Sequence, residues 1–160
     1  MISLADRVVK IAGITIRPDE SWMLQMARIE TDSQVGALGA KRYLILDRDT
    51  KFSEQFRRLI RKSGTNVIRL PPMSPNLNAY AERFVRSIKE ECLDRMIFVG
   101  QASLRRAVIE YMEHYHVERN HQGLENRLIQ MPTARAPHIG AVHRRARLGG
   151  TLNFYHRNAA

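Results

Sequence analysis

The sequence is poor in cysteine and in long apolar runs, and each scarcity excludes a class of protein. Its single cysteine, Cys92, cannot form an internal disulfide or a cysteine-based zinc site, so the composition fits a reducing compartment. No apolar run reaches the roughly 18 residues that a membrane span needs, and no charged-then-apolar stretch with a cleavage site opens the chain. We therefore expect a soluble, intracellular protein in which Cys92 is a small buried apolar side chain.

Carboxylates are also scarce relative to basic side chains. The 160 residues include 26 Lys and Arg against 16 Asp and Glu, a formal net charge of +10. All of this excess lies after residue 50, and residues 133–160 contain five arginines, three histidines and no carboxylate. Such a charge favours a polyanionic partner, either nucleic acid or an acidic membrane surface. We interpret residues 131–160 as a basic tail.

Short β-branched and apolar runs predict three strands. Residues 7–16 alternate in part, residues 42–46 are almost wholly apolar and end at Asp47, and residues 66–70 precede a proline-rich loop. The second run is typical of a strand buried on both faces. Because segments with helical periodicity separate these strands, the sequence predicts an α/β domain with one core.

Four segments have helical periodicity. Asp19 or Ser21 could cap the first helix, and Ser53 could cap the second. A third helix is expected to run for about five turns from Leu77, and a fourth over residues 102–117. We expect the apolar face of the third helix to lie in the core, with the residues Ala81, Phe84, Val85, Ile88 and Cys92.

Two carboxylates stand where a metal-dependent phosphodiester site would need them. Asp47 ends an apolar strand, and open α/β sheets bind ligands beyond such strand ends. Glu82 shares a polar helical stripe with Arg86 and Lys89. A pair of divalent cations needs hard oxygen ligands from rigid elements, which a strand end and a helix supply. The sequence pattern alone also allows purely structural roles, in which Asp47 forms a turn and Glu82 forms an ion pair with Arg86.

Three stretches of the chain carry recognisable motifs: YLILDRDTKFSEQFRRLIRKSG, LPPMSPNLNAYAERFVRSIKEECLDRMI and HYHVERNHQGLENRLI. Together they resemble the integrase catalytic core of the DDE transposase and retroviral-type integrase superfamily, in particular the transposases of bacterial insertion sequences. The resemblance covers most of residues 7–130 and implies an α/β, ribonuclease H-like fold, a mixed sheet flanked by helices. We assign residues 1–130 to this core, with an incomplete first strand, and residues 131–160 to the basic tail.

The resemblance implies catalytic roles for two carboxylates. Asp47 matches the second catalytic aspartate of the family and Glu82 its glutamate, 35 positions apart. Both residues would bind Mg²⁺ or Mn²⁺, of which the family uses two ions. Asp49 is a competing ligand, because residues i and i+2 share a face of an extended strand. The resemblance favours Asp47, since relatives often have a turn glycine where Asp49 stands.

The first aspartate of the family is replaced. Aligning residues 7–15 with the family places Ser3 at that position, and a neutral hydroxyl cannot bridge two divalent cations as a carboxylate does. Asp6 would face the other side of the strand and lie roughly 10 Å away, so we do not accept it as a substitute. We therefore expect the chain to be inactive or weakly active, as the downstream portion of a transposase.

A basic and polar set around Glu82 is expected to contact DNA phosphates and bases, although each member could simply belong to a solvated helix face. The set comprises Asn76, Asn78, Tyr80, Arg83, Arg86 and Lys89. The segment from Tyr115 to His121 matches a Tyr-x-x-x-Arg-x-His pattern of the family, in which we expect the histidine to be structural. His114 and His116 diverge by about 200° on a helix, so we discount them as a metal-binding pair.

The resemblance implies a function in DNA transposition and integration. In the family, water hydrolyses a phosphodiester at the element end, and the freed 3'-hydroxyl then attacks target DNA. The alternative is a catalytically inactive DNA-binding or oligomerisation fragment. The expected partners are the element ends, target DNA, and further copies of the chain or a full-length transposase. We expect no membrane partner and a cytoplasmic, nucleoid-associated location in a bacterium.

Overall fold

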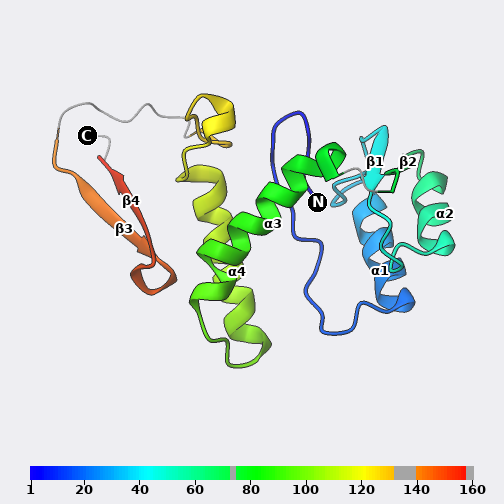
Figure 1. The fold of residues 1–160 in the computed structure, drawn as a ribbon, viewed down its shortest axis with the longest axis horizontal. Helices are drawn as coiled ribbons and strands as arrows, with labels where there is room; N and C mark the ends of the chain where they lie inside the picture. Colours follow the sequence, from blue (N-terminus) through cyan, green and yellow to red (C-terminus); the bar gives the residue numbers. More distant parts are fainter. Residues whose placement is uncertain (73–74, 132–139, 158–160) are drawn as a thin grey trace. The chain divides into compact units, whose positions relative to one another are not determined.

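The computed structural model describes residues 1–72, 75–131 and 140–157, and the chain divides into two compact units (Figure 1). The first unit consists of Met1 and Lys10–Ala79, and the second of Ile2–Val9 and Tyr80–Ala160. The described residues combine four α-helices with short strands, so the predicted α/β class is confirmed and the arrangement is compatible with a ribonuclease H-like core. None of the described helices has the length and apolar character needed to cross a membrane.

The first unit alternates helices and strands. Its elements are α1 (Glu20–Thr31), β1 (Tyr43–Leu46), α2 (Glu54–Lys62) and β2 (Asn66–Arg69). The two strands pair in parallel, with Tyr43 opposite Asn66 and Leu46 opposite Arg69. This order of strand, helix and parallel strand places the end of β1, and therefore Asp47, at one edge of the sheet.

Side-chain caps explain where both helices of the first unit begin. Asp19 accepts a hydrogen bond of 2.8 Å from the backbone N–H of Trp22, and Ser53 accepts one of 3.2 Å from Phe56. Each cap satisfies one of the backbone donors that a helix start leaves open. The helices then pack against the sheet around a buried core of Met23, Ala27, Leu38, Leu46, Phe56 and Ile60.

Two strand predictions need correction. Residues 7–16 form no strand within the described part of the chain, and Val9 makes only an isolated bridge with Ile2. A turn over residues 4–6 precedes the run: the Asp6 carboxylate accepts a hydrogen bond from the backbone N–H of Val8, and Arg7 has a φ of 62°. Residues 10–16 then pair with no strand in the described ranges. The expectation that β1 is buried on both faces is also wrong at Tyr43, which is 57% exposed.

The second unit joins two long helices to a hairpin. Its main elements are α3 (Ala79–Glu91), α4 (Gly100–Val117), β3 (His143–Arg147) and β4 (Leu152–His156). The two strands are antiparallel, with His143 opposite His156 and Arg147 opposite Leu152. Residues 143–156 of the expected basic tail are therefore a defined hairpin. The domain boundary at residue 130 remains a prediction.

Aromatic side chains form much of the core between α3 and α4. The ring of Phe84 meets that of Tyr115 edge-on, with centroids 5.1 Å apart, and Tyr111 and Cys92 are fully buried. Val85 was expected in this core but is 47% exposed. Residues 84, 88 and 92 follow one narrow helical stripe, and Val85 lies beyond its edge.

Candidate functional site

Asp47 lies exposed directly after the buried end of β1. Its Oδ1 accepts a hydrogen bond of 3.0 Å from the backbone N–H of Asp49, which orients the carboxylate at the start of the following turn. No other hydrogen bond to Asp47 occurs among the residues that the structure describes. One carboxylate oxygen is therefore accessible to a ligand.

Asp49, the competing ligand, is more fully engaged. The ammonium of Lys51 binds one carboxylate oxygen, and the backbone N–H of the same residue donates to the other at 3.0 Å. The side-chain hydrogen bond from Lys51 lowers the pKa of Asp49. A cation at Asp49 would have to displace Lys51, whereas one at Asp47 would not. Asp49 also lines an open cavity of about 400 Å³ with Pro18, Glu20, Thr50, Lys51 and Ser53.

Glu82 is exposed in the first turn of α3. It forms no ion pair with Arg86 in the part of the chain that the structure describes, so the plain helical pair is absent. Arg83, Arg86 and Lys89 are exposed on the same helix. Three positive charges therefore accompany an available carboxylate within about two turns of the helix.

Tyr80 packs against a residue that was not expected beside it. The guanidinium of Arg7 lies over the Tyr80 ring, 3.3 Å from its centroid, and the ring remains 46% exposed. The Nη1 atom of Arg7 is buried and has no hydrogen-bond partner among the described residues, so this nitrogen is not exposed for binding a phosphate. Asn78 is half-buried at the end of a short 3₁₀ helix, Pro75–Asn78. The side chain of Asn76 lies outside the described residues.

The structure places Ser3 in a turn of the second unit. Its backbone N–H donates to Val8 and its carbonyl accepts from Arg7, both at 2.9 Å. Ser3 and Glu82 belong to the second unit and Asp47 to the first. Within the described ranges, no group of three or more His, Cys, Asp or Glu side chains could hold a metal ion. The carboxylates of Asp47 and Glu82 are suitable donors for Mg²⁺. They supply two carboxylate ligands, whereas the resemblance implies a site with three.

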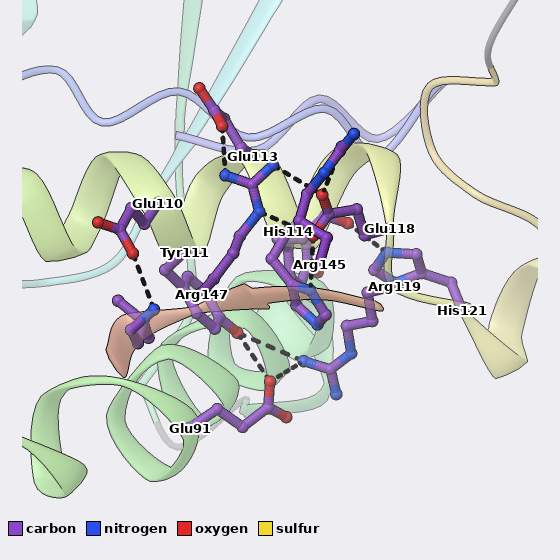
Figure 2. Close-up of polar contacts among 12 residues, drawn as sticks. Glu91, Glu110, Tyr111, Glu113, His114, Glu118, Arg119, His121, Arg145 and Arg147 are labelled. Carbon is purple, nitrogen blue, oxygen red and sulfur yellow. Dashed lines mark hydrogen bonds and ion pairs between the residues drawn. The ribbon is translucent and has the colours of Figure 1, made fainter. Parts of the chain in front are cut away.

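Arg119 and His121, the two residues of the family pattern near position 120, make contacts that stabilise the second unit. The Nε2 of His121 donates to the carbonyl of Tyr115 at 2.7 Å, and burial lowers the pKa of this histidine. Arg119 binds the carboxylate of Glu91 at 2.5 Å and the hydroxyl of Tyr111 at 3.3 Å. These contacts join the end of α4 to α3, as Figure 2 shows for Arg119, Glu91 and Tyr111.

His114 and His116 also have separate partners. The Nδ1 of His114 donates to Glu118 at 3.1 Å, whereas the Nε2 of His116 accepts a hydrogen bond of 3.0 Å from the backbone of Val9. The expected divergence of these two side chains on the helix explains why they bind different groups.

A buried charge cluster around Glu118 was not predicted from the sequence (Figure 2). The Glu118 side chain is only 1% exposed and accepts hydrogen bonds from Arg145, Arg147 and His114. Burial alone would raise the pKa of Glu118, but these three donors outweigh it and lower the pKa to about 2. The one feature of the sequence that bears on this cluster is the basic run of residues 143–147. Its pattern does not indicate which carboxylate these arginines bind.

The family comparison agrees with the motifs. Residues 63–128 match the integrase core domain family, a range that contains Glu82 and the cations beside it but not Ser3 or Asp47. No curated protein and no solved structure matches the chain. The resemblance is thereby confirmed for the part of the chain that includes α3 and α4. Residues 63–128 are therefore similar in sequence to an integrase core domain.

Proposed function

We propose that the chain is the integrase-core portion of a transposase, which cleaves phosphodiesters and transfers DNA strands with the help of divalent metal ions. The observation that carries this proposal is the exposed Glu82 carboxylate, which lies inside the integrase core match and has three cationic neighbours on α3. The replacement of the first aspartate by Ser3 would impair the reaction.

Asp47 and Glu82 would hold the metal ions. Carboxylate oxygens are the ligands that Mg²⁺ and Mn²⁺ prefer, and each of these two side chains is exposed. When bound, such ions supply Lewis-acid activation and charge stabilisation for phosphoryl transfer. Asp49 would support the turn through its contacts with Lys51 rather than act as a ligand.

The cationic and polar side chains would orient DNA. Arg83, Arg86 and Lys89 would bind phosphates along α3, and the exposed ring of Tyr80 would contact the strand near the helix start. The amides of Asn76 and Asn78 are proposed to contact DNA from the preceding loop. Element ends and target DNA are the proposed partners, together with a second copy or a full-length transposase, in the bacterial cytoplasm.

A second function is a catalytically inactive DNA-binding or oligomerisation module. It is favoured by the hydroxyl of Ser3 and by the lack of a three-donor group among the described residues. Such a module would bind DNA with the same cations but independently of Mg²⁺. It could enter mixed complexes with an active transposase and interfere with it.

Calorimetric titration with Mg²⁺, together with a cleavage and strand-transfer assay on labelled DNA, separates the two functions. The enzyme should release or absorb heat on binding Mg²⁺, and Asp47→Asn or Glu82→Gln should lower metal affinity and cleavage by about 10- to 100-fold or more. Glu90→Gln is a matched control, because Glu90 is another exposed carboxylate of α3. DNA binding that ignores Mg²⁺, without any cleavage, would support the inactive module.

A further inference from the structure

The hairpin of β3 and β4 has two faces with different chemistry. Side chains alternate along each strand, so Arg145 and Arg147 share one face with Phe154, which lies opposite Arg145 in the register. Arg144 and Tyr155, also directly opposite each other, share the other face. In β4, residues 152, 154 and 156 are half-buried, whereas residues 153 and 155 are exposed. The first face is called the inner face below, and the second the outer face.

Carboxylates of α4 and of Glu118, just after it, hold the inner face. Arg147 binds Glu118 at 2.7 Å and Glu113 at 2.5 Å, and Arg145 binds Glu118 at 3.1 Å (Figure 2). The backbone N–H of Leu148 donates to Glu110 at 2.8 Å. The positive charge of the inner face is therefore compensated within the second unit, and the hairpin is fixed in place.

On the outer face, the described residues show no such compensation of charge. Arg144 forms no ion pair within the described ranges, and Tyr155 is 63% exposed. Directly opposite side chains in an antiparallel pair have Cβ atoms about 4.5–5.5 Å apart, so the cation and the ring present adjacent surfaces. Residues 133–160 contain no carboxylate that could neutralise them. The outer face thus combines a free aromatic surface with a free positive charge.

We propose that the outer face of the hairpin binds single-stranded DNA, with a base stacked on Tyr155 and the neighbouring phosphate bound by Arg144. This inference rests on the proposed function for the identity of the nucleic acid. A phosphate complements the uncompensated charge, and every base has a π-face that can stack on tyrosine. In an intact duplex the bases already stack on one another, so the ring would gain little there. An unpaired strand is the ligand that uses both groups.

Fluorescence anisotropy with labelled oligothymidine, in EDTA, tests the proposal. Tyr155→Ala should weaken binding by about 5- to 150-fold, whereas Tyr155→Phe should bind like the unchanged chain, because the ring and not the hydroxyl stacks. Arg144→Ala should lower the slope of log K against log salt by about 0.7, the contribution of one phosphate on a single strand. Both side chains are exposed, so thermal unfolding should be unchanged and serves as the check on folding.

Tyr43→Ala is the matched control, since Tyr43 is 57% exposed and has the guanidinium of Arg42 at 5.8 Å from its ring centroid. It should leave the affinity for oligothymidine unchanged. An equal loss in Tyr43→Ala and Tyr155→Ala, or no loss in Tyr155→Ala, would overturn the assignment. So would an equal loss for duplex DNA, which would indicate groove binding. Because EDTA removes the metal ions, the result does not depend on whether Asp47 and Glu82 support cleavage.

Discussion

Arg147 binds the carboxylate of Glu118 through two nitrogens, Nε at 2.8 Å and Nη2 at 2.7 Å. The side chains of Arg147 and Glu118 are 14% and 1% exposed, and the two residues are 29 positions apart in the sequence. A bidentate pair of this kind fixes both distance and orientation. It therefore anchors β3 to the end of α4, a contact that positions the whole hairpin.

Glu118→Ala should lower the free energy of unfolding by about 3–5 kcal/mol, because it leaves Arg147 as a poorly compensated buried charge. Glu113→Ala is the control: Glu113 binds the same arginine but is 57% exposed, so its loss should cost at most about 1 kcal/mol. Urea unfolding measures both values. Equal effects of the two substitutions would show that burial of Glu118 is unimportant.

Acid should weaken the same contact. Because the pKa of Glu118 is about 2 in the folded chain and 4.5 is its ordinary value, the stabilisation is complete above about pH 4.5 and is lost as the pH falls toward 2. The difference between the two values corresponds to about 3 kcal/mol. Unfolding measured between pH 6 and pH 3 should therefore show a steeper loss in the unchanged chain than in Glu118→Gln. Parallel curves would contradict the assigned pKa.

Ser3→Asp should increase Mg²⁺-dependent cleavage of labelled DNA if Ser3 occupies the position of the first aspartate. The substitution would add an anionic oxygen pair to the proposed ligands Asp47 and Glu82, and affinity for divalent cations rises with ligand charge. Combining it with Glu82→Gln should abolish the gain, because the amide keeps the shape and removes the charge.

Two outcomes would argue against this alignment of the first strand. A gain that survives Glu82→Gln would have its origin outside the proposed site. Cleavage that depends on Asp6, tested with Asp6→Asn, would make that residue the third ligand in place of Ser3.

Binding to duplex DNA should be sensitive to salt and largely indifferent to sequence. Each phosphate neutralised on a duplex contributes about 0.9 to the slope of log K against log salt. Lys89→Gln should lower this slope by about 0.9 and weaken binding to all DNA sequences alike. Lys62→Gln, on the exposed surface of α2, is the control and should change neither the salt slope nor the affinity for DNA. An affinity that stays constant between low and moderate salt would refute electrostatic binding.

Local signals were sufficient for the helices and for two strands. The caps at Asp19 and Ser53 and the apolar run before Asp47 act within a few residues, so the sequence alone predicted where α1, α2 and β1 begin or end. The run over residues 7–16 has strand propensity too. There the propensity was not realised, because this run has no strand partner among the described residues beyond the single bridge of Val9 with Ile2.

Contacts between distant residues could not be predicted in this way. The pair of Glu118 and Arg147 depends on how the hairpin folds back on α4, and no periodicity encodes that approach. The stacking of Arg7 on Tyr80 is of the same kind. For the candidate site, the motifs identified Asp47 and Glu82, and the structure adds that both are exposed and that Lys51 engages the rival Asp49.

Because Cys92 is buried, its reactivity reports on the separation of α3 from α4. The thiol is fully buried between α3 and α4, its Sγ lies 3.8 Å from the carbonyl of Ala107, and burial raises its pKa. A thiol reagent can reach it only when the two helices separate, and it is the sole cysteine. The rate of Cys92 alkylation under native conditions would therefore measure local opening of this helix pair, without any label elsewhere in the molecule.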